Sequence, residues 1–187
     1  MSHADGIARL TAEQLDPALR DLLQPTVDRL GYLGEFFAVA GHVPGAVPAF
    51  MQYTGAVKAP LSDRQNETLA LTVCAALGAD YERIQHERLS RRLGMSDAWI
   101  GAAEGRAGAV ASALTEDESL LRALALVMIA RNGERCAAEI QAVAKAVGPS
   151  QAVAALLQIT RFVTIAMLCN ALQLELPVPS VFDEPAR

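Results

Sequence analysis

The sequence predicts an all-α protein made of one domain, and three observations carry this prediction. Hydrophobic residues make up 52% of the chain but aromatic residues only 5%, so the core must consist of small aliphatic side chains packed at short helix–helix distances. Helix-capping signals precede several apolar segments of helical periodicity. A length of 187 residues corresponds to about one domain with a well-buried core.

The N-terminal part of the chain, about residues 1–42, is expected to be a helical extension. Apolar residues recur there at helical spacing, but three residues interrupt the pattern: Pro25, Gly31 and Gly34. Two short helices or one kinked helix are therefore predicted. A His-Val-Pro-Gly turn at 42–45 then leads into a helix expected over 46–58.

Two capping boxes mark the beginnings of later helices. In each box a Ser or Thr precedes the helix, and the side chain of a Gln or Glu three residues later accepts a hydrogen bond from the backbone N–H of that Ser or Thr. The pairs are Ser62 with Gln65 and Thr115 with Glu118. The helices that they begin are expected over 62–77 and 115–131.

A further helix is predicted over 80–93, immediately after the first capped helix. Asp80 is expected to cap its beginning and Gly94 to end it, because glycine readily adopts the backbone conformation of a helix C-terminus. Only Gly78 and Ala79 separate it from the preceding helix. So short a connection favours two helices that fold back on each other.

The rest of the chain is expected to contain three more helices and a tail. The helices are predicted over 96–104, 134–147 and 150–172. A Gly/Ala-rich segment at 105–112 is the candidate boundary between two helical halves. The last helix carries an apolar stripe wide enough to be buried on more than one side, as in a central helix or a subunit interface. The proline-rich tail, about 176–187, is expected to be non-helical and to lie over the surface or over a neighbouring subunit.

Charge and cysteine usage exclude several classes of function. The net charge is −5 and the chain lacks a basic face, so no nucleic-acid partner is expected. The three cysteines share no C-x-x-C spacing, so neither a disulfide framework nor a zinc site is predicted, and a cytoplasmic location is expected. The first residues do not match a secretory signal, and the apolar runs are shorter than a membrane span, so no membrane partner is expected.

Four side chains within 67–86 carry the candidate chemistry. Glu82 and His86 lie one helical turn apart on the same face, where a carboxylate can orient or stabilise an imidazole. Glu67 lies on the preceding helix and is expected to reach the same pocket. Tyr81 adds a phenol. The sequence therefore predicts an acid–base site in which Glu67, Glu82 and His86 converge.

The chain contains segments that are similar to a known family. They are LSDRQNE at 61–67, YERIQH at 81–86, RRLGMSD at 91–97 and IAMLCNAL at 165–172. Together they resemble the carboxymuconolactone decarboxylase and alkylhydroperoxidase D superfamily, from about residue 42 through the final helix. The resemblance implies an alkylhydroperoxidase D-like helical bundle that assembles as a homo-oligomer, from dimer to hexamer, with sites near subunit contacts.

The redox branch of that family has a pattern that this chain keeps only in part. Its pattern is Glu, eleven residues, Cys, two residues, Cys, three residues, His, and Glu67 and His86 match its two ends. Ala79 and Glu82 stand where that branch has its thiols, so dithiol peroxidase chemistry is expected to be absent. The decarboxylase-like branch instead resembles this chain in having Tyr-Glu followed by His at this spacing.

The leading functional hypothesis is a cofactor-independent enzyme acting on a small organic acid or lactone by decarboxylation or proton shuttling. His86 would be the general acid or base, Glu67 and Glu82 would orient it or exchange its proton, and Tyr81 would donate a hydrogen bond to the substrate. Candidate holders of a substrate carboxylate are Arg64 and Arg83. No cofactor or metal is predicted.

Two other functions are kept as alternatives. One is a non-catalytic oligomeric protein that binds a small ligand. The other is peroxidase-type activity through a single cysteine, Cys74, although a small buried thiol is the simpler interpretation.

Each site residue also has a purely structural interpretation. His86 would be a hydrogen-bonded histidine between helices, Glu82 a partner of surface cations, and Tyr81 a core ring with its hydroxyl bonded. His42, in the turn before the 46–58 helix, is a lower-ranked candidate for the pocket.

Overall fold

The computed structural model describes residues 5–183, and within this range the secondary structure is helical without strands. The prediction of an all-α fold is confirmed. The helices are α1 (Pro17–Leu30), α2 (Glu35–Ala40), α3 (Ala46–Lys58), α4 (Asp63–Ala76), α5 (Asp80–Arg92), α6 (Asp97–Glu104), α7 (Glu116–Ala130), α8 (Ala137–Val147) and α9 (Pro149–Ala171), with short 3₁₀ turns η1 (Ala12–Gln14) and η2 (Ala111–Ala113).

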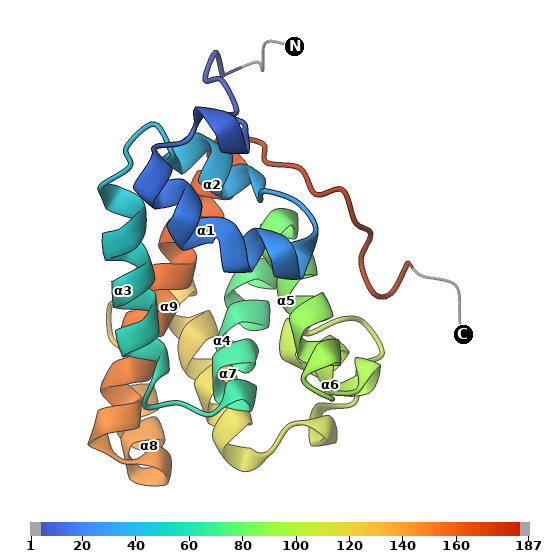
Figure 1. The fold of residues 1–187 in the computed structure, drawn as a ribbon. Helices are drawn as coiled ribbons and strands as arrows, with labels where there is room; N and C mark the ends of the chain where they lie inside the picture. Colours follow the sequence, from blue (N-terminus) through green and yellow to red (C-terminus); the bar gives the residue numbers. More distant parts are fainter. Residues whose placement is uncertain (1–4, 184–187) are drawn as a thin grey trace.

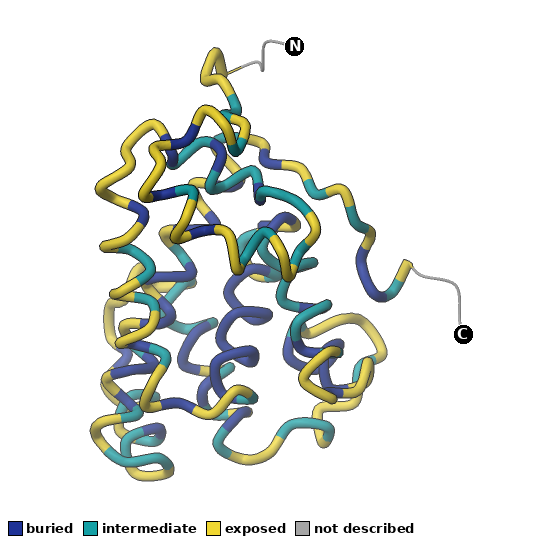
Figure 2. The backbone as a smooth tube through the Cα atoms, viewed as in Figure 1, coloured by how far each residue is buried: buried dark blue, intermediate teal, exposed yellow. Residues whose placement is uncertain are grey.

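Helix α4 lies at the centre of the molecule, and α5, α6, α7 and α9 pack around it (Figure 1). Every residue of α4 from Gln65 to Cys74 is buried, which Figure 2 shows as a continuous dark blue helix. The largest core cluster joins α4 to α7, α8 and α9 through aliphatic side chains, with Phe162 as its aromatic member. This arrangement is the one expected from a chain rich in small hydrophobic residues.

Both predicted capping boxes are present. The backbone N–H of Ser62 donates to Oε1 of Gln65 at 2.9 Å, and the N–H of Thr115 donates to Oε2 of Glu118 at 2.9 Å. Glu118 has a second role that the pattern did not show, because its buried carboxylate also accepts hydrogen bonds from Arg64 and Trp99. The cap of α7 thereby connects α4, α6 and α7.

Four local predictions need correction. The N-terminal part contains two separate helices, α1 and α2, as one of the two predicted forms, but α1 continues through Pro25 and ends only at Gly31, whose φ of 82° is left-handed. The exposed Pro25 removes one backbone hydrogen bond, but the apolar face that includes Leu19 and Leu23 holds the helix in the core. Asp80 does not cap α5; its carboxylate accepts from the Arg83 guanidinium instead.

The third correction concerns the beginning of α8, which starts at Ala137 and not at 134. Asn132, Gly133 and Arg135 have φ values of 50°, 79° and 55°, and a helix cannot begin until the chain leaves this left-handed turn. The 105–112 segment does not separate two halves either, because α4 packs against α6 before it and α7 after it.

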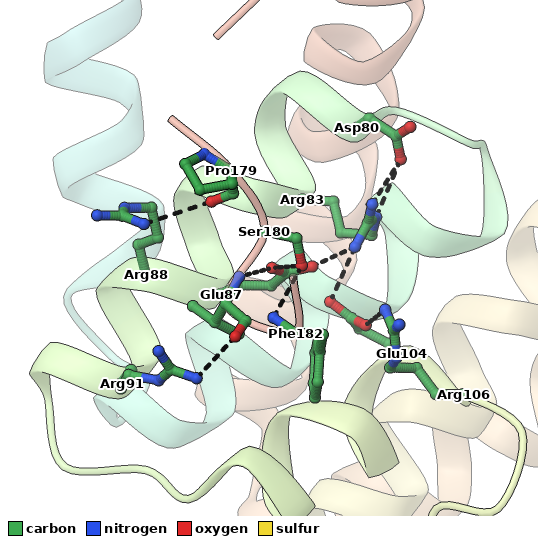
Figure 3. A network of polar contacts seen from close by, with 11 residues as sticks. Asp80, Arg83, Glu87, Arg88, Arg91, Glu104, Arg106, Pro179, Ser180 and Phe182 are labelled. Carbon is green, nitrogen blue, oxygen red and sulfur yellow. Dashed lines mark hydrogen bonds and ion pairs between the residues drawn. The ribbon is translucent and has the colours of Figure 1, made fainter. Parts of the chain in front are cut away.

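The described part of the C-terminal tail is non-helical, as predicted, and residues 184–187 of that prediction lie outside the described residues. Figure 3 shows how α5 holds the tail: Oε2 of Glu87 accepts hydrogen bonds from Oγ of Ser180 at 2.6 Å and from the backbone N–H of Val181 at 3.0 Å. Arg88 and Arg91 donate to carbonyl oxygens of Pro179 and Val181. The tail is therefore attached to its own chain's α5.

Helix α9 is long and apolar enough to cross a membrane by length and composition. In this fold, 56% of its most apolar window is buried, and α9 packs against α3, α4 and α8. Burial among neighbouring helices accounts for its composition, as in the core helix of a globular protein.

Candidate functional site

Helices α4 and α5 bring Glu67 and His86 together. The two helices fold back on each other through the short 77–79 connection, which places Nδ1 of His86 2.7 Å from Oε2 of Glu67. Ser90, one turn further along α5, also donates to Oε2 of Glu67 at 3.4 Å. Glu67 is 2% exposed, so its carboxylate is held inside the fold by these two donors.

Glu82 approaches the other nitrogen of the imidazole. Its Oε2 atom lies 3.6 Å from Nε2 of His86, so the ring is placed between two carboxylates from different helices. Burial acts to lower the pKa of His86, but the charges and hydrogen bonds of Glu67 and Glu82 outweigh it and raise the pKa to about 9. At neutral pH the His86 ring is therefore an imidazolium.

These three side chains line one cavity of about 580 Å³. Helices α1, α2, α3, α4, α5 and α9 contribute to its wall, together with the 31–34 loop and Val178 of the tail. Much of the wall is aromatic or aliphatic, and the aromatic members are Tyr32, Phe36, Phe37, Phe50, Tyr81 and Phe162. A mostly apolar cavity with a few convergent polar groups is the usual form of a small-molecule site.

Tyr81 also lines the cavity, but its hydroxyl already has a partner. The backbone N–H of Phe36 donates to Oη of Tyr81 at 3.2 Å, and the ring is 5% exposed. Burial raises the pKa of Tyr81 above its ordinary range. Its hydroxyl proton is thus available for a hydrogen bond to a ligand, while the ring joins α5 to α2.

Several sequence candidates lie away from the cavity. Arg64 pairs with Glu118 and stacks on Trp99, and Arg83 pairs with Glu87 and Asp80, so neither proposed carboxylate holder belongs to the wall. His42 is exposed, and its Nε2 is 2.8 Å from a backbone oxygen of the N-terminal segment.

Cys74 is fully buried, and burial raises the pKa of its thiol well above the ordinary value. Within residues 5–183, no group of three or more His, Cys, Asp or Glu side chains is arranged to hold a metal ion.

Sequence reasoning missed a chain of polar side chains in the cavity wall. Arg161 of α9 donates through Nε to Oε1 of Gln158 at 2.8 Å, and Gln158 donates through Nε2 to Oδ1 of Asn66 at 2.9 Å. All three line the cavity. The available signal was a glutamine and an arginine, three residues apart, that interrupt the apolar pattern of α9. Charged residues are rarely buried unless they are paired.

The comparisons with known proteins agree with this architecture. The model of the carboxymuconolactone decarboxylase family matches residues 44–126. No curated protein matches the chain.

Among solved structures, an uncharacterized peroxidase-related protein from Ralstonia eutropha JMP134 with an alkylhydroperoxidase AhpD core has a TM-score of 0.78 at 16% identity, covering 90% of each chain. A cysteine-to-alanine variant of the debrominase Bmp8, in complex with 2,3,4-tribromopyrrole, has a TM-score of 0.72 at 16% identity, covering 85% of each chain. The apo form of that debrominase has a TM-score of 0.72 at 15% identity, covering 86% of each chain.

The fold and site define a helical protein in which consecutive central helices supply a Glu–His pair to one cavity. The chain is similar to the carboxymuconolactone decarboxylase family over residues 44–126, which is less than half of its length, and its fold is that of alkylhydroperoxidase D-like proteins. The matched residues include Glu67, Glu82 and His86, but α1, α2 and α9 lie outside them. Much of the cavity wall therefore comes from helices beyond the matched segment.

Proposed function

We propose that the protein is a cofactor-independent acid–base enzyme acting on a small organic acid or lactone, by decarboxylation or a related proton transfer. The observation that carries the proposal is the Glu67–His86–Glu82 arrangement in the cavity wall, with the imidazole charged at neutral pH. Such a group is a proton donor that is already protonated when the substrate binds.

The proton path follows from the hydrogen bonds. Nδ1–H of His86 is directed at Glu67, so Nε2–H is the proton that can leave toward a ligand. In a decarboxylation, the bond between the substrate carbon and its carboxylate breaks, CO₂ leaves, and the electron pair remains on that carbon. The carbon then takes the proton from Nε2, and a proton from water, passed through Glu82, restores the imidazolium. Glu67 stabilises the charged ring and fixes its orientation.

The position of Glu82 favours this proposal over a binding protein without chemistry. A glutamate turned outward to a surface arginine would have favoured a purely structural role. Instead Glu82 lines the cavity and lies beside His86, which supports the enzyme. A cytoplasmic location, expected from the sequence, remains part of the proposal.

A panel of unsaturated and keto carboxylic acids, with γ-carboxymuconolactone among the lactones, tests this function. Release of CO₂ and changes in ultraviolet absorbance would be followed for the wild type and for His86→Gln. His42→Gln is the matched control, because this histidine lies outside the cavity. We expect turnover in the wild type and the control and its loss in His86→Gln. Full activity in His86→Gln would exclude the acid–base role.

The binding alternative makes a different prediction for the same proteins. A panel compound would raise the melting temperature of the wild type and of His86→Gln alike, and neither protein would convert it. That combination would replace the enzyme by a ligand-binding protein.

A further inference from the structure

Arg161 is a buried cation in the cavity wall. The residue is 8% exposed, and its guanidinium lies 3.9 Å from the centroid of the Phe162 ring and 5.9 Å from that of Phe50. Burying a guanidinium is costly unless a carboxylate or several hydrogen bonds compensate for the lost water. The partners of Arg161 therefore show whether its charge is already compensated within the fold.

Within residues 5–183, the compensation is incomplete. The guanidinium donates one hydrogen bond, from Nε to the neutral amide of Gln158, and forms no ion pair with any described carboxylate. Burial lowers the pKa of Arg161, although the charges of Glu82 and Glu67 act in the opposite direction. The terminal Nη groups can therefore donate hydrogen bonds to a ligand in the cavity. A planar guanidinium pairs with a carboxylate through two parallel hydrogen bonds.

The orientation of Arg161 is fixed by a chain of amides. Nδ2 of Asn66 lies 3.0 to 3.4 Å from three backbone oxygens, those of Lys58, Leu61 and Ser62, so its Oδ1 atom must face Gln158. Gln158 then donates to Oδ1 and presents its own Oε1 to Arg161. An arginine that only filled space would not need two buried amides to orient it.

The rest of the cavity fits an anion with a flat apolar part. Phe162 contacts both the Arg161 guanidinium and the His86 ring, whose centroid lies 5.1 Å from that of Phe162 in an edge-to-face arrangement. A ligand bound at Arg161 therefore extends over one aromatic ring toward the imidazolium. Four further cations line the cavity, the exposed Arg29 and Arg92 and the half-buried Lys58 and Arg88. They favour the entry of anions into a protein whose net charge is −5.

We propose that Arg161 is the substrate-anchoring residue and that it binds a carboxylate of a small, flat, unsaturated or aromatic organic anion, with Gln158 and Asn66 as positioning residues. The proposal deepens the proposed function and rests on it for the use of this cavity as the substrate site.

The charge of Arg161 also determines which carboxylate it can hold. An ion pair stabilises a carboxylate, whereas a carboxylate that leaves as CO₂ loses its charge, so pairing it with Arg161 would slow the reaction. The carboxylate at Arg161 is therefore one that the product keeps. The reacting carbon lies at the other end of the ligand, near Nε2 of His86 and the Glu82 carboxylate. Substrates that decarboxylate here carry a second acidic group.

Titration with benzoate, followed by calorimetry and by protein NMR, tests the anchor without requiring turnover. Benzoate supplies one carboxylate and one flat ring, and benzyl alcohol is the neutral probe of the same size. We expect saturable benzoate binding to the wild type, at least about tenfold weaker binding to Arg161→Gln, and an intermediate loss in Arg161→Lys, which keeps the charge but not the planar guanidinium. Benzyl alcohol should bind all three proteins equally.

Arg131→Gln is the matched control, because it removes the same charge from the exposed turn after α7. Its benzoate affinity should equal that of the wild type. Gln158→Leu keeps Arg161 but removes its orienting amide, and should also weaken benzoate binding. Circular dichroism and melting temperature would establish that each variant is folded.

Two outcomes would overturn the proposal: equal benzoate affinity in folded Arg161→Gln and the wild type, or no saturable benzoate binding to the wild type at millimolar concentrations. Loss of turnover in His86→Gln is a separate result. The benzoate titrations can exclude the role of Arg161 while the acid–base function is retained. Turnover measurements can exclude the acid–base function while the role of Arg161 is retained.

Discussion

Nδ1 of His86 and Oε2 of Glu67 lie 2.7 Å apart across the α4–α5 pair, in a region where both side chains are largely removed from solvent. With Glu82 on the other side of the ring, this contact keeps His86 charged well above the pH at which a free histidine loses its proton. The pair therefore links the stability of the fold, the pH of the solution and the proposed proton transfer.

Folding stability should fall as the pH rises from about 6.5 to about 9, because His86 has its ordinary pKa of 6.5 in the unfolded chain and a pKa of about 9 in the fold. The contribution is fully present below pH 6.5 and is lost as the pH passes through 9; its size is about 3 kcal/mol at most. Urea unfolding at several pH values would show this slope in the wild type and its loss in His86→Gln. An unchanged slope in the variant would contradict the assignment.

A second slope at lower pH should come from Glu104. Burial and the neighbouring Glu87 raise the pKa of Glu104 to about 7 from 4.5, although Arg83 and Arg106 act in the opposite direction. The unfolded chain therefore releases this proton first, and stability falls between about pH 4.5 and 7 before levelling off.

Glu104→Gln should flatten that interval, while the exposed control Glu116→Gln should leave it intact. The same series of urea unfolding curves measures both. Equal slopes in the two variants would mean that Glu104 does not titrate in this range.

Ser180 should stabilise the fold through the buried carboxylate of Glu87. The contact between Oγ of Ser180 and Oε2 of Glu87 is 2.6 Å, and both residues are buried, so Ser180→Ala leaves a buried acceptor with one donor fewer (Figure 3). We expect a loss of about 1 to 3 kcal/mol in the free energy of unfolding. Ser112→Ala, at an exposed position in η2, is the control and should change stability by less than about 0.5 kcal/mol.

Cys74 should be dispensable for activity. Its thiol is fully buried with a raised pKa, which disfavours the thiolate that peroxidase chemistry needs, and Ala79 and Glu82 stand where the redox branch has its cysteines. Cys74→Ala should keep the turnover of any substrate found, and the wild type should lack dithiol-dependent alkyl hydroperoxide reduction. Robust peroxidase activity that the variant loses would instead make Cys74 the functional thiol.

The homo-oligomer remains a proposal, and α9 supplies its candidate surface. Val153, Leu157, Met167 and Leu168 lie along this helix with 41% to 64% of their surface exposed, an apolar stripe that a second copy of the chain would cover. Light scattering should give a mass above that of the monomer at micromolar concentration.

Aspartate at Val153 and Met167 should reduce that mass, whereas Val110→Asp, an equally exposed position on a loop, should not. A monomer mass for the wild type would refute the proposal.

The sequence by itself determined the elements that depend on neighbouring residues. Both capping boxes, the short turn between α4 and α5, and the helical spacing of Glu82 and His86 are local features, so the pattern alone predicts them. The approach of Glu67 to His86 also followed, because so short a connection leaves two consecutive helices few ways to pack. Local signals failed at Pro25 and at Asp80, where packing of an apolar face and an ion pair with Arg83 outweighed propensity.

Only the tertiary structure decided what surrounds the site. Arg161 and Gln158 lie more than 70 positions beyond His86, and the α9 pattern, although interrupted by them, does not indicate that they face the same cavity. Likewise, the sequence presents Glu87 only as one of several charged residues on α5. The tertiary structure shows that the tail packs over it and that Ser180 donates a hydrogen bond to it. Contacts between residues distant in sequence depend on how all the helices pack at once, and that packing gives this chain its cavity wall and its candidate anion anchor.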